Sequence, residues 1–464
     1  MDIEIELKLL ATPSAYQDIL SWLAQSRLNY TDSAGKQLRN DYFETPQRTL
    51  RKHDIGLRIR GCNGEFEQTV KTKGIVVAGM HQRPEYNVPL PSPDLKLDLF
   101  DPRIWPASVD LTALENDLYL MFSTDFLRHT FLITFSDGAQ VELVFDQGTI
   151  SANGRSVDIC EVELELKKGD PAILFEIAQQ LVCVTPLRFG MQSKAARGYR
   201  LADNAAPQCY QPPANFNMNT DMSTAQGAIA ALEQSLEVWQ GGEDAFYQSQ
   251  NVNDWRTIKA GMLLAQETLN LFENQFSPAK KQQILTLGHQ LRSLIGQYEN
   301  VDLSLCAQAL SDEENLFLVG APHASELKEK LATSASTATL LSTMNALLND
   351  KQNMQLQLGI GALLVDESKA PTACDKSLSY FVDEALECFD GGLASARNKL
   401  ALFKVLLLDL KLPIGINHND DPWSVLRQED ESSFRTGLTK LLQQGTIVLQ
   451  PEATERVLIW CAKN

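Results

Sequence analysis

Short segments in the first 200 residues repeatedly alternate charged with aliphatic side chains, and this alternation constrains the fold more than any other feature of the sequence. In the segment Ile3-Glu4-Ile5-Glu6-Leu7-Lys8-Leu9, a period of two places the charged residues on one face of a β-strand and the aliphatic residues on the other. The same pattern returns at 56–61, 65–72, 82–88, 140–147 and 159–167. Each of these strands therefore has one face that must be buried and one face that carries ions of both signs.

Turn-forming dipeptides separate several of these segments. Asn63-Gly64, Asp137-Gly138 and Asn153-Gly154 are typical of β-hairpin loops. Helical patterns at about 13–26 and 170–183 interrupt the strands. The complete set of expected strands is 3–10, 39–44, 56–61, 65–72, 82–88, 128–136, 140–147 and 159–167.

Two arrangements would bury the aliphatic faces of these amphipathic strands. In an ordinary sandwich, the ionic faces lie outside in water. In the other arrangement the aliphatic faces pack outward under helices and the ionic faces surround a common axis. A dry charged interior would cost several kcal/mol per unpaired ion, so the second arrangement requires a water-filled tunnel or groove. The periodicity alone favours neither.

The chain changes character after about residue 200. Residues 203–222 are rich in Pro, Asn and Asp without periodicity and are expected to form a linker. Helical periodicity then dominates, which predicts an N-terminal α+β domain at 1–202 and an all-α helical bundle at 223–464. The expected helices are one around Ile229–Trp239 and others at 253–276, 278–298, 300–310, 322–348, 370–388, 390–411 and 430–444.

Charge and composition exclude several classes of partner. Residues 1–200 carry 22 basic and 27 acidic residues, whereas 201–464 carry 19 and 32, so the net charge of −18 is mostly C-terminal. Such a chain repels nucleic acid and anionic lipid unless a local basic site is present. It has no C-x-x-C pair, no signal-peptide pattern and no apolar run of membrane-spanning length. We therefore expect a cytoplasmic protein that binds neither nucleic acid nor membrane.

The ionic faces themselves suggest a chemistry. Glu161, Glu163 and Glu165 place like charges about 7 Å apart along one strand, and the approach of Glu4 and Glu6 would increase the repulsion. A divalent cation relieves it, and carboxylate oxygens favour Mg²⁺ or Mn²⁺. The arginines and lysines instead suit an oligo-anionic ligand, because guanidinium groups donate paired hydrogen bonds to phosphate oxygens. Together these sets indicate phosphoryl transfer.

At this point the sequence resembles a known family, the CYTH or triphosphate tunnel metalloenzyme superfamily, which is marked by an E-x-E-x-K signature at Glu4–Lys8. Further motifs follow in the order of the family and cover nearly all of the first 200 residues. They are YFETP (42–46), GLRIR (56–60), TVK (69–71), HQRPEYN (81–87), STDFLR (123–128), FDQG (145–148), CEVELEL (160–166) and SKAARGY (193–199). Within the superfamily, the sequence is most similar to bacterial inorganic triphosphatases in which a CYTH domain precedes a CHAD domain. The resemblance implies an eight-stranded antiparallel tunnel, a closed barrel, for a linear triphosphate and a divalent metal.

The resemblance also implies roles for individual residues. The implied metal ligands are Glu4, Glu6, Asp146, Glu163 and Glu165, and the implied phosphate-binding residues are Lys8, Arg58, Arg60, Lys71, Arg83, Arg128 and Lys194. Glu4, Glu6, Lys8, Glu163 and Glu165 would form the catalytic set, with Glu163 and Glu165 as candidates for the general base. Glu85 and Glu161 would orient the bases, and Arg197 is a weaker phosphate-binding candidate.

The implied activity is hydrolysis of inorganic tripolyphosphate to pyrophosphate and phosphate, with Mg²⁺ as cofactor. Two alternatives remain open: thiamine triphosphatase or adenylate cyclase activity within the same superfamily, and a non-catalytic polyphosphate-binding scaffold. The sequence contains no P-loop, which argues against an ordinary NTPase. Tyr42, Phe43 and Tyr86 are the only aromatic candidates for a base-binding pocket, and we expect them to pack in the core. The acidic C-terminal half argues against polyphosphate binding by the CHAD-like region.

Overall fold

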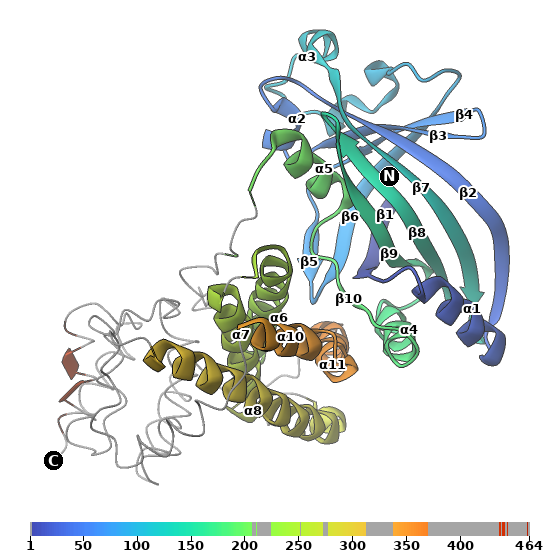
Figure 1. Cartoon of the computed structure of the whole chain (residues 1–464). Coiled ribbons are helices and arrows are strands. Elements are labelled where there is room, and N and C mark those ends of the chain that lie inside the picture. The colour runs from blue at the N-terminus through green and yellow to red at the C-terminus, as the bar shows by residue number, and fades with distance from the viewer. Residues whose placement is uncertain are drawn as a thin grey trace. The chain divides into compact units, whose positions relative to one another are not determined.

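A computed structural model of the chain describes residues 2–206, 210, 224–250, 252–271, 277–311 and 337–369, with a few positions between 436 and 462. The chain divides into two compact units, Met1–Pro207 and Gln208–Asn464 (Figure 1). The first unit is built mainly of strands and the second of helices. Each is considered by itself.

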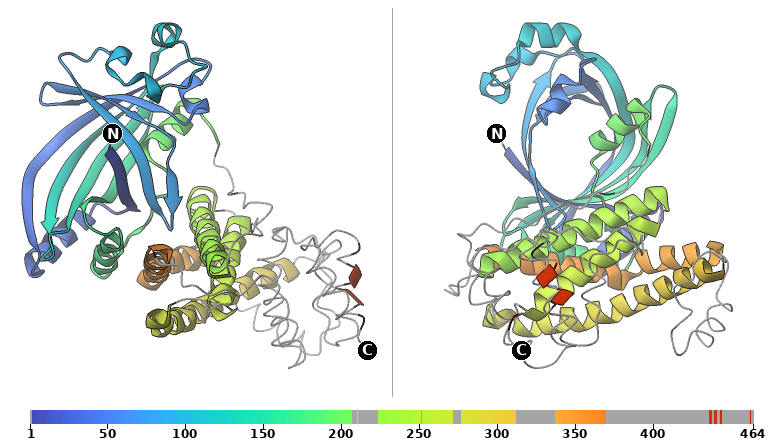
Figure 2. Two further views of the ribbon diagram at one scale, coloured as in Figure 1. Left: turned by 180° about the vertical axis from the view of Figure 1, so that it is seen from behind. Right: turned by 90° about the vertical axis from the view of Figure 1, so that its left-hand side faces the viewer.

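The first unit is a closed antiparallel barrel. Its eight strands run in the order β1-β9-β8-β7-β2-β3-β4-β6, and β6 pairs with β1 to complete the ring. The view along the barrel shows this ring (Figure 2, right). Closure confirms the expected eight-stranded tunnel and excludes the open sandwich. The strands are β1 (Asp2–Leu10), β2 (Asn29–Glu44), β3 (Gly56–Cys62), β4 (Glu65–Lys71), β6 (Met80–Leu90), β7 (Tyr119–Thr134), β8 (Gln140–Ala152) and β9 (Arg155–Lys168), with the short β5 (Ile75–Val77) and β10 (Arg188–Phe189) beside the ring.

The expected hairpin turns are present. At Asn63-Gly64 both residues have positive φ (52° and 85°), as they do at Asn153-Gly154 (52° and 71°). This is the backbone of a two-residue turn whose twist matches the flanking strands. Strands β2 and β7 begin well before the expected 39–44 and 128–136. The additional residues are largely polar in β2 and mostly apolar in β7. Neither run alternates strictly, so the period-two test does not detect them.

The aliphatic faces of the strands point away from the barrel axis and are covered by helices. Leu7 and Leu9 on β1 are fully buried, and helix α4 (Ala172–Val182) packs against β1 and β9. On the other side, the segment with η1 (Leu97–Leu99), η2 (Pro102–Ile104) and α3 (Leu111–Asp117) covers Leu57 and Val70. The remaining flanking helices are α1 (Ala15–Gln25) and α2 (Thr49–Lys52).

Helix α5 (Lys194–Asp203) was not expected from periodicity. It packs against β7, β8 and β9, and its side chains join a core cluster with Tyr42, Phe122 and Phe126. Figure 2 shows it at the wall of the ring. Its sequence, KAARGYRLAD, has Leu201 as its single large aliphatic residue, so no stripe of such residues indicated a helix.

The described part of the second unit is helical, as expected. It contains α6 (Thr224–Ser249), α7 (Val252–Leu271), η3 (Pro278–Lys280), α8 (Lys281–Ser311), α10 (Thr337–Leu348) and α11 (Lys351–Lys369). The expected helices at 278–298 and 300–310 are one helix, α8, and α11 was missed. The expected helices at 370–388 and 390–411, and most of the linker 203–222, lie outside the described residues. Of the expected helix 430–444, only isolated positions are described. Within the described ranges, no helix has the length and apolarity needed to cross a membrane.

Candidate functional site

The charged faces of the strands meet in a cavity inside the barrel. Because the aliphatic faces are covered from outside, the alternating residues of each strand point inward. Ten of the residues expected to form the site line this cavity. They are Glu4, Glu6, Lys8, Arg58, Arg60, Lys71, Arg83, Arg128, Glu163 and Lys194.

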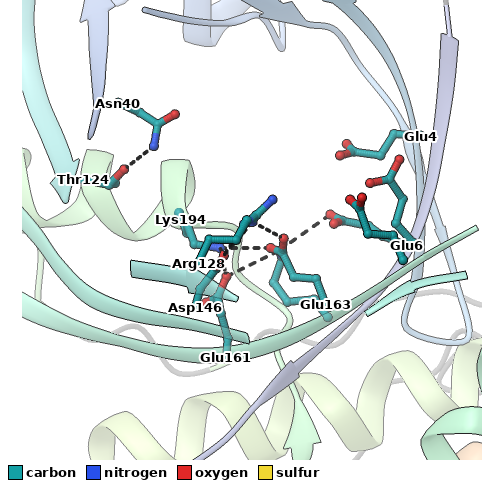
Figure 3. Close-up of polar contacts among 12 residues, drawn as sticks. Glu4, Glu6, Asn40, Thr124, Arg128, Asp146, Glu161, Glu163 and Lys194 are labelled. Atoms are coloured by element: carbon teal, nitrogen blue, oxygen red, sulfur yellow. Dashed lines mark hydrogen bonds and ion pairs between the residues drawn. The ribbon is translucent and has the colours of Figure 1, made fainter. Parts of the chain in front are cut away.

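Glu163 on β9 lies at the centre of the most concentrated group of charges (Figure 3). Its carboxylate accepts hydrogen bonds from Lys8 Nζ, from Lys194 Nζ at 3.0 Å and from Arg128 Nη2 at 2.8 Å. Lys8 Nζ also lies 3.6 Å from Glu6 Oε1, so one ammonium group links the carboxylates of β1 and β9. The sequence separation between Lys8 and Glu163 shows that closure of the ring creates this group.

The ion pairs around Glu163 and Lys8 shift the pKa values of both side chains. Burial alone would raise the pKa of Glu163, but Lys194, Lys8 and Arg128 outweigh it and hold that pKa well below its usual value. Burial would likewise lower the pKa of Lys8, whereas Glu163, Glu6 and Glu161 together raise it well above the ordinary value. Both Glu163 and Lys8 are therefore stabilised in their charged forms.

A second ionic group lies on the facing strands. Lys71 Nζ forms ion pairs with Glu4 and, at 3.2 Å, with Glu85, whose other oxygen accepts from Arg58 Nη2 at 3.3 Å. Burial would raise the pKa of Glu85, but Lys71 and Arg58 lower it to about 2. Glu85 thus pairs with two cavity cations, and its role in orienting them stays a prediction.

Arg60 and Arg83 differ from the other cavity cations because, among the described residues, neither forms an ion pair with a carboxylate. Arg60 Nε instead donates to Asn40 Oδ1 at 2.9 Å, and Asn40 in turn donates to Thr124 Oγ1 at 2.9 Å. A neutral amide therefore fixes Arg60 without compensating its charge. Burial, Arg58 and Arg128 lower the pKa of Arg60 to about 10, which indicates an excess of positive potential at this point.

Five residues to which the resemblance gave a role do not line the cavity: Glu85, described above, Arg197, Asp146, Glu161 and Glu165. Asp146 and Glu161 are fully buried beneath it, where Asp146 accepts two hydrogen bonds from Arg128 (2.8 and 2.6 Å) and both acids bind Lys194. Glu165 pairs with Lys167 Nζ at 2.7 Å, and burial and the neighbouring Glu142 and Glu6 raise its pKa. The roles of Asp146 and Glu165 as metal ligands, of Glu165 as general base and of Glu161 in orienting the bases stay predictions.

The cavity is also lined by two residues that the sequence analysis did not place in the site. Tyr42 lines it, although the ring is also part of the expected core and stacks on Phe122 at 4.5 Å. His81 lines it too, opposite Glu6 in the β1–β6 pairing, and burial with Lys8 nearby lowers its pKa to about 4. His81 shares the inward face of its strand with Arg83, which was expected in the site, and Tyr42 lies two positions from Asn40, which bonds to Arg60. If the alternation along each strand had been applied to neutral residues as well as to charged ones, Tyr42 and His81 would have been predicted to face the cavity.

The donor set fits a hard divalent cation in part. Asp146, Glu161 and Glu163 each place one oxygen within 4.8 Å of the others, but Lys194 already bonds to all three. Glu4 and Glu6 face the cavity, and each has one described ion partner, Lys71 and Lys8 respectively. The buried Nε of Arg58 and Nε2 of His81 have no hydrogen-bond partner, which is consistent with an interior that receives a polar ligand.

The depressed pKa of Glu85 gives a test of the second ionic group. Because its folded-state pKa of about 2 lies below the ordinary 4.5, its charge stabilises the fold above pH 4.5 and this contribution is lost as the pH falls toward 2. We expect Glu85→Gln to lower the free energy of unfolding by about 3 kcal/mol at pH 7 and by less at pH 3. Urea unfolding at several pH values measures the difference. Glu65→Gln, at an exposed position of β4, should show no such dependence, and a difference for Glu85→Gln that is constant with pH would contradict the assignment.

The first unit is a closed antiparallel barrel whose interior is lined by acidic and basic side chains. This arrangement is a tunnel-type fold with an interior suited to a charged ligand. Comparison with known proteins agrees. Residues 2–199, nearly the whole of the first unit, match the family model described as the CYTH domain. The family model does not extend into the second unit.

The same part of the comparison with known proteins includes one relative with a named activity. The chain is 36% identical over 205 residues to an inorganic triphosphatase of Haemophilus influenzae, a match that covers 43% of this chain and 54% of the relative. The chain thus matches about half the length of that relative.

Solved structures resemble the same part of the chain. A candidate adenylyl cyclase from Hippeastrum, described as having a dominant triphosphatase activity, covers 42% of this chain and 95% of its own at 18% identity, with a TM-score of 0.33. A candidate adenylate cyclase from Bacillus halodurans covers 42% and 98% at 22% identity, with a TM-score of 0.29.

Proposed function

We propose that the chain is a metal-dependent triphosphatase that hydrolyses inorganic tripolyphosphate to pyrophosphate and phosphate inside the barrel. The observation that carries the proposal is the pair of arginines, Arg60 and Arg83, that line the cavity without a carboxylate partner among the described residues. Uncompensated guanidinium groups beside carboxylates suit a ligand with several phosphate groups. The similarity to an inorganic triphosphatase supports the same substrate.

The basic and the acidic residues of the cavity would have different roles in the reaction. Arg58, Arg60 and Arg83 would bind the phosphate oxygens and hold the chain of phosphates in one orientation. Lys8 and Lys194, kept charged by Glu163, would stabilise the negative charge that develops on the departing pyrophosphate. Glu163 and Glu165 are the candidates for orienting the attacking water.

Mg²⁺, or Mn²⁺ in its place, would be held by Glu4 and Glu6 together with Glu163. The metal would offset the charge of the phosphate oxygens and act as a Lewis acid. Glu4 and Glu6 would supply two negative charges to its site, and Lys8 would keep Glu163 ionised beside them.

Phosphate release from three substrates tests this function. Tripolyphosphate, ATP and thiamine triphosphate are compared with and without Mg²⁺. We expect the highest kcat/KM for tripolyphosphate and little release without metal. A preference for thiamine triphosphate, or pyrophosphate and cyclic AMP formed from ATP, would favour the other activities of the superfamily, and binding without release would favour a scaffold.

The phosphate-binding role of Arg58 gives a separate prediction. Arg58→Ala removes a cavity guanidinium whose Nε is unpartnered and is expected to raise KM for tripolyphosphate about 10- to 100-fold. Steady-state kinetics measures the change. Arg103→Ala, at an exposed position outside the cavity, is the matched control, and equal KM values for Arg58→Ala and the control would contradict the role.

We also propose that the second unit is a CHAD-like domain and that the protein is cytoplasmic. The helical elements of the unit and its position after a CYTH domain support the first proposal. The acidic balance of the C-terminal half argues against a polyphosphate-binding role for it.

A further inference from the structure

Lys194 reaches the cavity in a different way from the other cations that line it. Those cations lie on strands of the ring, where ladder hydrogen bonds fix the backbone. Lys194 is the first residue of helix α5, after Ser193, whose hydroxyl caps the helix by accepting from Ala196 N at 3.1 Å. The position of its ammonium group therefore depends on how α5 is held against the barrel.

Tyr199 makes a buried contact between α5 and the barrel. Its side chain is buried, and its hydroxyl donates to Glu44 Oε2 at 3.0 Å. The ring packs edge-on against Phe122 with 5.3 Å between centroids. The neighbouring Gly198 lies so close to Phe122 that a Cβ would come within 2.1 Å of the ring, so α5 approaches this strand as closely as its backbone allows.

Glu44 is a rigid acceptor for this hydroxyl. It is the last residue of β2 and is fully buried. Its carboxylate accepts from the backbone N–H groups of Thr45 (2.8 Å), Leu50 (3.0 Å) and Arg51 (2.9 Å). These bonds fix the carboxylate at the corner between β2 and α2. Burial and the adjacent Glu44 raise the pKa of Tyr199, so the phenol stays a donor.

We propose that Tyr199 and Glu44 are positioning residues that set how far Lys194 enters the cavity, with α5 as the rigid connection. Tyr199 lies five positions after Lys194 in the helix, which is an axial distance of about 7.5 Å. A shift of the helix at Tyr199 therefore also moves Lys194. At the cavity end, Lys194 Nζ lies among Asp146 (2.7 Å), Glu161 and Glu163 (3.0 Å). The inference rests on the proposed function, in which Lys194 acts on the substrate.

A double-mutant cycle between Tyr199→Phe and Lys194→Gln tests the connection. Tyr199→Phe removes only the hydroxyl, and we expect it to lower kcat/KM for tripolyphosphate about 10-fold by displacing Lys194. Lys194→Gln is expected to lower it about 100-fold. In the Lys194→Gln background, Tyr199→Phe should cause no further loss, because the displaced group is already absent.

The control is another tyrosine in the same unit. Tyr119→Phe removes a hydroxyl that accepts from Arg48 at 2.6 Å outside the cavity, and kcat/KM should not change. Thermal unfolding of every variant shows whether the fold is intact. If Tyr199→Phe does not fold, Glu44→Asp takes its place in the cycle, because it keeps the charge and shortens the reach by one methylene.

The outcomes separate this inference from the proposed function. An active wild type in which the two effects multiply would overturn the positioning role alone. If the wild type binds tripolyphosphate without hydrolysing it, the same cycle is measured on Kd by calorimetry, and independence of the two effects again overturns the role. A wild type that neither binds nor hydrolyses tripolyphosphate would end the proposed function and this inference with it.

Discussion

Replacing Glu6 by glutamine is expected to lower kcat for tripolyphosphate about 100- to 1,000-fold. Glu6 lines the cavity, and its described ion pair, with Lys8 at 3.6 Å, is long. The amide preserves the shape of the side chain but removes a negative charge that a divalent cation requires. We therefore also expect a higher Mg²⁺ concentration for half-maximal activity.

Stability separates this effect from general damage. Because Lys8 keeps its stronger partner Glu163, the free energy of unfolding of Glu6→Gln should stay within about 0.5 kcal/mol of wild type. Glu65→Gln, at an exposed position of β4, is the matched control with unchanged kinetics. Wild-type kcat and an unchanged Mg²⁺ requirement in Glu6→Gln would remove Glu6 from the metal site.

Glu163→Gln is expected to affect both activity and stability. Its carboxylate is shared by Lys8, Lys194 and Arg128, and the amide leaves three buried cations with fewer negative partners. We expect the free energy of unfolding to fall by about 3 kcal/mol. Hydrolysis should be lost as well, because Lys8 and Lys194 would no longer be held in place. Urea unfolding and phosphate release measure the two effects.

The same variant should respond to anions in a characteristic way. Tripolyphosphate added without metal should raise the melting temperature of Glu163→Gln more than that of the wild type, since the ligand replaces the missing negative charge. A variant with wild-type stability would show that Glu163 does not balance these cations. An equal response to tripolyphosphate in both proteins would place the ligand away from them.

The grouping of the charged residues on one face of each strand could be predicted because it depends on local geometry. Alternation along β1 sets Glu4, Glu6 and Lys8 on one face whatever the rest of the chain does. The turns at Asn63-Gly64 and Asn153-Gly154 are equally local, since they depend on residues that tolerate positive φ. The closed ring itself was not fixed by periodicity and was expected only through the family resemblance.

The partners of each charge could not be predicted, because they depend on register between distant segments. Lys194 lies 33 residues from Glu161 in the sequence, and Lys8 lies 155 residues from Glu163. Alternation also does not show where along a strand the cavity ends. Glu165 shares a face with Glu163, yet it pairs with Lys167 and does not line the cavity.

The sequence by itself determined which side chains share one face of a strand, because the two-residue period of a strand is a property of the backbone. It also determined the chemical character of that face, through its acids and bases. The tertiary structure alone decided which acid neutralises which base, and left Arg60 and Arg83 without a described carboxylate partner. It also brought Lys194 in on a helix. These features follow from closure of the ring and from the docking of α5 by Tyr199 and Glu44, which are long-range contacts that no local pattern specifies.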